Sequence, residues 1–261
     1  MNQPSGTLED PLREALRLIS LADARGLSLR LMGGLAFHVR APDWTARIAR
    51  ERRDIDLATI GRSRKGVAEL LVDAGYVPDR EYNALYGHRQ LYFIDPRFER
   101  PVDVLVDRLE MCHRIEFADR LEADHPTLPL ADLLLSKLQV VKINRKDVLD
   151  GLVLLAEHPL AEADRDGISI PRIVAHTSND WGWWRTVTDN LTKLRLFVEV
   201  ELKPDELDVG RSHRFDPIDQ IDALREAIDA APKSVRWKLR SRVGDRVLWY
   251  EEPEEVRHDH G

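Results

Sequence analysis

The stretch that decides the fold reads Leu-Ser-Leu-Arg-Leu-Met-Gly-Gly-Leu-Ala over residues 27–36. Its first half alternates apolar and polar residues as a half-buried strand does, and the apolar run after the glycines must end before Pro42. The pattern predicts a strand, a glycine turn and a short helix. At Gly33 and Gly34 a bare backbone can approach a ligand, and the N–H groups that open a helix can hold phosphate oxygens. An ordinary turn is the alternative.

The segments around this stretch alternate between helical and strand patterns as far as about residue 110. An amphipathic helix is predicted over residues 8–24 and a second over 65–74, and short apolar runs predict strands over 55–60, 90–94 and 102–106. Strands that alternate with helices in this way favour a sheet with helices packed on it.

The remainder of the chain carries mainly helical periodicity. Its predicted helices cover residues 130–141, 147–156, 171–177, 181–200, 217–230 and 235–243, and the last of these also alternates as a strand would. We therefore expect an α+β fold with two domains. Residues 1–125 would form a small mixed β-sheet with helices, and residues 126–261 an all-helical C-terminal region.

Composition narrows the class of protein. The 261 residues include 39 Lys and Arg against 46 Asp and Glu, a net charge of −7, and 43% are apolar, which is typical of a packed globular protein. The acidity argues against a general nucleic-acid coat protein. With no long apolar run, no basic and apolar leader, and a single cysteine, Cys112, we expect a cytoplasmic protein that makes no use of a membrane.

Three aspartates suggest a site that binds a divalent cation. Asp54 and Asp56 lie two apart on a predicted strand, so both side chains would project from one face, where a divalent cation such as Mg²⁺ would relieve their repulsion. Asp103 interrupts an apolar strand, where burial of a carboxylate is costly unless it meets a cation or partner. The bland alternative for the pair is a solvated edge strand, and a second Asp-x-Asp at residues 164–166 lies in an evident loop.

Together these features point to a reaction class. Three carboxylates on neighbouring strands, beside a glycine turn suited to phosphate, would hold two metal ions around a triphosphate. This is the equipment of phosphoryl or nucleotidyl transfer.

The same residues resemble a known family over about residues 27–156. The chain is similar to the polymerase-β-like nucleotidyltransferase superfamily, and most of all to the minimal nucleotidyltransferases related to AbiE-type toxins and to aminoglycoside nucleotidyltransferases. The resemblance rests on residues 31–36 (LMGGLA), 54–57 (DIDL), 102–105 (VDVL), 130–139 (LADLLLSKLQ) and 145–150 (RKDVLD). The chain departs from the family pattern just before the first aspartate. Residues 50–53 read Arg-Glu-Arg-Arg there, and the threonine usual in the family is absent.

The resemblance implies a role for each matched residue. Gly33, Gly34, Arg50 and Arg53 would contact the nucleotide. The metal ligands would be Asp54, Asp56 and Asp103, holding two Mg²⁺ or Mn²⁺ ions, with Asp103 also helping to deprotonate the acceptor. Lys137 would contact the triphosphate, supported by Asp147 or Asp150.

The expected function follows from these roles. It is a Mg²⁺-dependent nucleotidyltransferase that moves a nucleoside monophosphate from a nucleoside triphosphate to a hydroxyl of RNA, protein or a small molecule, with release of pyrophosphate. A toxin–antitoxin pair would add an antitoxin-like partner. Two alternatives stay open: a non-catalytic nucleotide- or partner-binding regulatory module, and a metal-dependent phosphohydrolase. The latter usually adds histidines near the aspartates, and His38 and His88 have no recognisable spacing.

Overall fold

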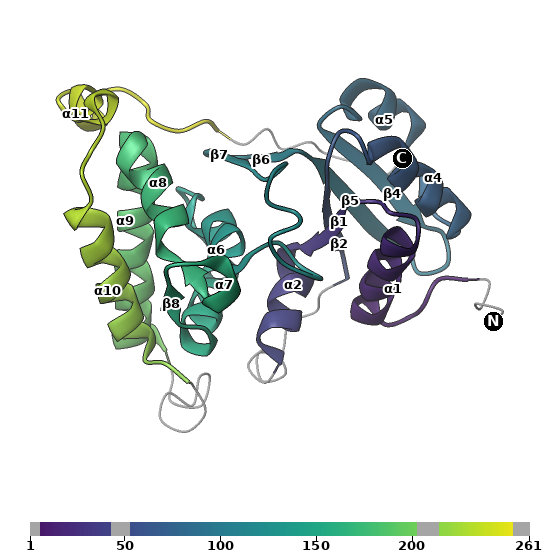
Figure 1. The fold of residues 1–261 in the computed structure, drawn as a ribbon, viewed down its shortest axis with the longest axis horizontal. Coiled ribbons are helices and arrows are strands. Elements are labelled where there is room, and N and C mark those ends of the chain that lie inside the picture. The colour runs from purple at the N-terminus through teal and green to yellow at the C-terminus, as the bar shows by residue number, and fades with distance from the viewer. Residues whose placement is uncertain (1–5, 43–52, 203–213, 253–261) are drawn as a thin grey trace.

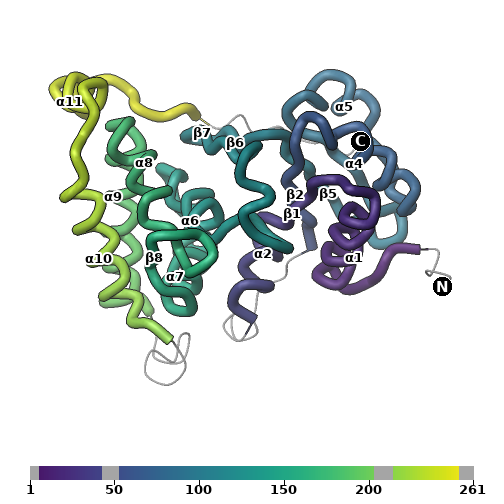
Figure 2. The backbone as a smooth tube through the Cα atoms, viewed as in Figure 1, coloured from purple at the N-terminus to yellow at the C-terminus, as the bar shows by residue number. Residues whose placement is uncertain are grey.

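The computed structural model describes residues 6–42, 53–202 and 214–252. Figure 1 shows a β-sheet with helices α1, α4 and α5 on one side of the molecule, and a group of helices, α6 to α11, on the other. Helix α2 lies between the two groups, and the chain trace in Figure 2 follows the same path. The expected α+β fold with a small mixed sheet is confirmed.

The sheet has five strands in the order β1-β2-β5-β4-β3. They are β1 (Leu29–Met32), β2 (Ile55–Thr59), β5 (Arg100–Val106), β4 (Gln90–Asp95) and β3 (Val77–Pro78). Only β2 and β5 are parallel, and every other neighbouring pair in this sheet is antiparallel. The two strands that carry the predicted carboxylates are therefore direct neighbours.

Burial alternates along β5 as its sequence predicts. Val102 and Val104 are fully buried, whereas Asp103 and Leu105 on the opposite face are half-buried. The buried residues join a core to which α1 (Pro11–Ala24) and α4 (Arg64–Asp73) also contribute. One face of the sheet is thus committed to the core, and the other remains partly accessible.

Three helices flank the strands at defined places. Helix α2 (Gly33–Arg40) begins directly after β1 and packs on β1 and β2, α1 packs on β1, and α5 (Arg80–Tyr86) packs on β4. The start of α1 follows from local chemistry, because the Asp10 side chain accepts a hydrogen bond from the Arg13 N–H and Pro11 occupies the first turn. Such a cap is worth about 1 kcal/mol.

The second half of the chain is helical, as predicted. Its helices are α6 (Leu130–Leu138), α7 (Arg145–Glu157), α8 (Ile170–Asn179), α9 (Trp181–Leu196), α10 (Pro217–Ala230) and α11 (Val235–Ser241). The ambiguous segment at 235–243 is thus a helix. The region is not all-helical, however, because β8 (Leu160–Ala161) and β9 (Ile168–Ser169) form a short parallel pair. Two-residue strands are too short to show any periodicity.

Four further elements have no counterpart in the sequence-based prediction. They are β3, α5 and the hairpin of β6 (Arg108–Glu110) and β7 (Arg114–Glu116). Each is at most seven residues long, and tertiary pairing rather than a repeating apolar pattern holds it. Among the described helices, none has the length and apolar content needed to cross a bilayer.

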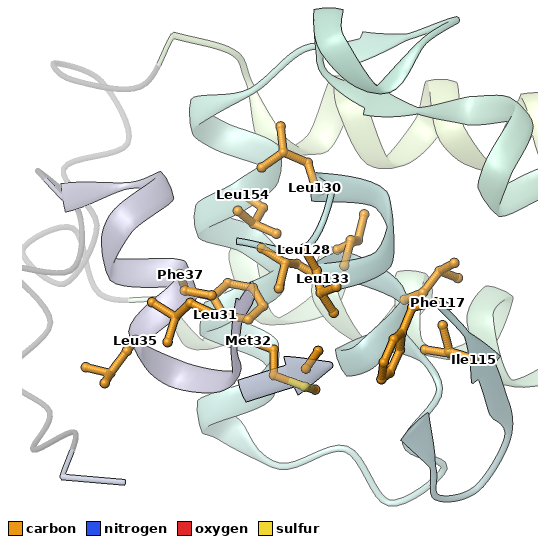
Figure 3. Close-up of a cluster of buried hydrophobic side chains, with 14 of the residues drawn as sticks. Leu31, Met32, Leu35, Phe37, Ile115, Phe117, Leu128, Leu130, Leu133 and Leu154 are labelled. Carbon is orange, nitrogen blue, oxygen red and sulfur yellow. The ribbon is translucent and has the colours of Figure 1, made fainter. Parts of the chain in front are cut away.

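A continuous hydrophobic cluster joins the sheet to the helical layer. Figure 3 shows Leu31 of β1 and Phe37 of α2 beside Leu133 of α6 and Leu154 of α7. Residues 126–128 also lie along the edge of β1, where the Leu31 N–H donates to the Pro126 carbonyl and the Leu128 N–H to the Leu31 carbonyl. The domain boundary between residues 125 and 126 stays a prediction.

Candidate active site

The glycine turn and the second aspartate occupy one small space. Gly33 has φ +62°, in the left-handed region, and a Cβ built on it would lie 1.8 Å from Oδ2 of Asp56. The register explains this proximity, because Met32 of β1 lies opposite Asp56 of β2. Both the backbone conformation and the available space therefore require glycine at position 33.

The start of α2 adds backbone donors to this place. The helix begins at Gly33, with Gly34 as its second residue, and within the described part of the chain no side chain caps its first turn. The first N–H groups of a helix have no intrahelical acceptor and carry a partial positive charge. They suit the oxygens of a phosphate group.

The two other carboxylates are brought close to Asp56 in different ways. Asp56 and Asp103 occupy paired positions on the parallel strands β2 and β5, about 4.8 Å apart by strand spacing. Asp54 is exposed and directly precedes β2, which begins at Ile55. Burial raises the pKa of Tyr92, and the negative charges of Asp103 and Asp54 raise it further, so both carboxylates act on the same ring.

The side chains of the central pair contact different neighbours. Asp56 lies against Gly33 on the β1 side, whereas Oδ1 of Asp103 accepts a hydrogen bond of 2.5 Å from Nε2 of Gln90 on the β4 side. Within residues 6–42, 53–202 and 214–252, no three His, Cys, Asp or Glu side chains are grouped closely enough to hold a metal ion.

The donor set nevertheless fits Mg²⁺. This cation usually takes one or two carboxylates together with waters and substrate phosphates, rather than a complete cage of protein ligands. Asp56 and Asp103 offer two carboxylates at adjacent positions, and Asp54 is exposed beside them. Their carboxylate oxygens are of the hard type that Mg²⁺ prefers.

A cavity of about 410 Å³ is lined by Gln90, whose side chain donates the hydrogen bond to Asp103. Its wall includes Gln90 and Leu105, which flank Asp103, and the rings of Tyr82 and Tyr86, whose centroids are 5.0 Å apart. No pattern in the sequence indicated Gln90 or these tyrosines. They lie 13 or more positions from Asp103, and only the pairing of β4 with β5 and the packing of α5 on β4 bring them to it.

Lys137 of α6 forms a separate charged cluster with α7. Its Nζ lies 2.8 Å from Oδ1 of Asp147 and 3.1 Å from Oδ2 of Asp150, and 5.2 Å from the centre of the Phe37 ring on α2. Burial by itself would lower the pKa of Lys137, but the two carboxylates outweigh it and raise that pKa above the ordinary value. Lys137 therefore stays positively charged at neutral pH.

Of the two arginines predicted to contact the nucleotide, only Arg53 lies among the described residues. Arg53 is exposed and adjoins Asp54 directly before β2. Arg50 lies outside the described residues. The predicted residues thus fall into two groups, one at the sheet (Gly33, Gly34, Arg53, Asp54, Asp56 and Asp103) and one between α6 and α7 (Lys137, Asp147 and Asp150), with α2 touching both.

Comparison with known proteins identifies no family. No family model matches the chain, and no curated protein matches it. Among solved structures, the antibiotic-resistance factor ANT(2'')-Ia is similar with a TM-score of 0.35 and 16% sequence identity. That match covers 53% of this chain and 80% of the other.

Proposed function

We propose that this chain is a Mg²⁺-dependent nucleotidyltransferase, which transfers a nucleoside monophosphate from a nucleoside triphosphate to a hydroxyl group and releases pyrophosphate. One observation carries the proposal: Asp56 and Asp103 occupy paired positions on neighbouring strands, with Asp56 packed against Gly33 at the start of α2. Carboxylates suited to a cation therefore adjoin backbone donors suited to phosphate.

Each residue has a distinct task in this proposal. Asp54, Asp56 and Asp103 would hold Mg²⁺, or Mn²⁺ in its place, and the metal supplies charge neutralisation of the triphosphate. The N–H groups at Gly33 and Gly34 hold phosphate oxygens, and Arg50 and Arg53 add positive charge. Positioning and charge stabilisation provide most of the rate in such reactions.

The transfer exchanges one phosphorus–oxygen bond for another. The acceptor oxygen forms a bond to the α-phosphorus as the bond from that phosphorus to the bridging oxygen breaks. The hydroxyl proton passes to the Asp103 carboxylate, and the electron pair of the broken bond leaves with pyrophosphate. RNA, protein and small-molecule hydroxyls all satisfy this chemistry, and an antitoxin-like partner would act by covering the same site.

Lys137 would contact the triphosphate, as the family resemblance implies. Its two carboxylate partners hold Nζ over the ring of Phe37 of α2, the helix whose first turn holds the phosphates in this proposal. Asp147 and Asp150 would therefore act by orienting Lys137.

A labelling experiment tests the function. Purified protein receives α-labelled nucleoside triphosphates, Mg²⁺ and a cell extract, and labelled products are separated by size and by nuclease or protease sensitivity. Asp56→Ala and Asp103→Ala should each lower labelling by about 1000-fold, because each removes a carboxylate that faces the triphosphate. Asp166→Ala is the matched control, since it alters the exposed second Asp-x-Asp and should leave labelling unchanged. If Asp56→Ala and Asp103→Ala both label products as strongly as the unchanged protein does, the proposal is contradicted.

The binding module is a second candidate, and one observation favours it. The described residues contain no group of three metal-ligating side chains. Calorimetry separates the two candidates. A binding module would take up a nucleoside triphosphate equally well with and without Mg²⁺, and it would show no turnover.

A further inference from the structure

We propose that Gln90 is a positioning residue, which holds the Asp103 carboxylate in the orientation that metal binding and transfer require. This inference rests on the proposed function and assigns a residue that neither the motifs nor the resemblance indicated. Its basis is the 2.5 Å hydrogen bond from Nε2 of Gln90 to Oδ1 of Asp103.

The register of the sheet brings the side chains of Gln90 and Asp103 within reach of each other. Strand β4 runs antiparallel to β5, with Tyr92 opposite Asp103 and Gln90 opposite Leu105. Gln90 and Tyr92 are two apart on one strand, so both side chains lie on the Asp103 face of the sheet. Gln90 is thus the diagonal neighbour of Asp103, at a separation that a long side chain can bridge.

The chemistry of glutamine suits the task. Its amide donates a hydrogen bond but carries no charge, so this contact orients the carboxylate without neutralising it. The contact with Gln90 by itself therefore adds no positive charge at Asp103.

The hydrogen bond is compatible with metal binding. A carboxylate has about four lone-pair positions, and the contact with Gln90 uses one of them, on Oδ1. Groups that hydrogen-bond to metal-binding carboxylates fix their orientation, and their loss typically lowers metal affinity or activity by about 10- to 100-fold. Truncation of Gln90 should therefore act through Asp103 while the fold persists.

The experiment measures metal binding and turnover separately on the full chain. Mn²⁺ binding is followed by electron paramagnetic resonance in the presence of a non-hydrolysable nucleoside triphosphate, and kcat and KM are measured by the labelling assay. Gln90→Ala should weaken Mn²⁺ binding about 10-fold and lower kcat by about 10- to 100-fold, with KM for the nucleotide changed less than about threefold. Gln90→Asn, with a shorter amide, should fall between this variant and the unchanged protein.

Gln220→Ala is the matched control. Gln220 donates from its own amide to the carbonyls of Leu155 and His158 in the helical half, so its truncation removes hydrogen bonds of the same kind away from the sheet. It should lower the melting temperature without changing Mn²⁺ affinity or kcat. If Gln90→Ala lowers the melting temperature more than Gln220→Ala does, Gln90→Asn decides the question. It should still weaken Mn²⁺ binding and lower kcat relative to the unchanged protein.

The outcomes distinguish this inference from the proposed function. Unchanged Mn²⁺ affinity and kcat in Gln90→Ala, together with an inactive Asp103→Ala, would overturn the role of Gln90 and leave the function standing. Absence of transfer by the unchanged protein would overturn the function. In that case Mn²⁺ affinity would still decide on Gln90, by whether Gln90→Ala and Asp103→Ala weaken it alike.

Discussion

At the scale of single residues, position 33 carries two constraints that are usually separate. Its backbone lies at φ +62°, and the space beside it holds the Asp56 carboxylate. Gly26 has nearly the same backbone angle, φ +66°, but nothing lies within 4 Å of the place where its Cβ would be. The two glycines therefore allow conformational strain to be separated from the crowding of a functional side chain.

The first prediction compares Gly33→Ala with Gly26→Ala. Both should lose about 1 kcal/mol of stability from left-handed strain, and Gly33→Ala should lose more, because the methyl group displaces Asp56. Only Gly33→Ala should lower labelling, by at least about 100-fold. Chemical denaturation measures the stability, and the labelling assay measures the activity. Equal activity of the two variants would show that Asp56 is not part of the site.

The second prediction concerns the Lys137 cluster. Lys137→Met should destabilise the protein by about 3 kcal/mol, because the largely buried Asp147 and Asp150 would lose their shared cation. Adding Asp150→Asn should restore part of this loss, since it removes one of the unpaired charges. Denaturation of the single and double variants measures the effect. Equal destabilisation in both would mean that the two carboxylates do not depend on Lys137.

At the scale of elements, a buried glutamate secures α1 against the sheet side of the molecule. The Glu14 side chain accepts hydrogen bonds from Arg17 at 2.8 and 2.7 Å, from the Tyr76 hydroxyl at 2.7 Å and from the Leu8 N–H. Burial by itself would raise the pKa of Glu14, but these hydrogen bonds outweigh it and hold that pKa below the ordinary value of 4.5. The charged form of Glu14 therefore stabilises the folded state.

The third prediction follows from the sign of that shift. A carboxyl whose pKa is lower in the folded than in the unfolded state stabilises the fold above the unfolded value and loses this contribution as pH falls through the folded value. Glu14→Gln should therefore be less stable than the unchanged protein at pH 7, and the difference should shrink below about pH 4.5. Glu9→Gln, at an exposed position, is the control and should leave the stability nearly unchanged at pH 7. Denaturation between pH 3 and 8 provides the measurement, and a difference independent of pH would contradict the assignment.

At the scale of the whole molecule, the segment after α11 packs back against the β6–β7 hairpin, and we call this contact the closure. After α11 the C-terminal segment returns toward β6 and β7 (Figure 1), and the Glu251 N–H donates to the Cys112 carbonyl. Trp249 anchors this segment, because its Nε1 donates to Oγ1 of Thr186 at 3.1 Å and its ring packs edge-on against Trp181. The segment thus connects the helical layer to the hairpin that follows β5.

The fourth prediction tests this closure. Trp249→Ala should lower the stability by about 2 kcal/mol, through loss of a half-buried aromatic contact and its hydrogen bond. The neighbouring Leu248 is 60% exposed, and Leu248→Ala should cost less than about 0.5 kcal/mol. Thermal denaturation compares the two. Similar melting temperatures would show that the segment contributes nothing to closure.

The fold was predictable wherever a repeating pattern was long enough to be read. The strand and helix around Gly33, the strands at Asp56 and Asp103 and the long helices from residue 130 onward lie where periodicity placed them, within a few residues. Short elements such as α5, the β6–β7 hairpin and the β8–β9 pair were missed, because pairing partners rather than periodicity define them. The predicted roles of the site residues stay predictions, although the register places Asp56 beside both Gly33 and Asp103.

The sequence by itself determined which segments bury their apolar faces, where the chain must turn, and which carboxylates interrupt otherwise apolar strands. These properties depend on neighbours only a few positions away, and local sterics and hydrophobic spacing are sufficient to specify them. Only the tertiary structure decided that Asp103 turns toward Gln90 while Asp56 packs on Gly33, and that Lys137 lies between α2 and α7. Such contacts join residues that are distant along the chain, so they are specified by strand register and helix packing, which no local pattern contains.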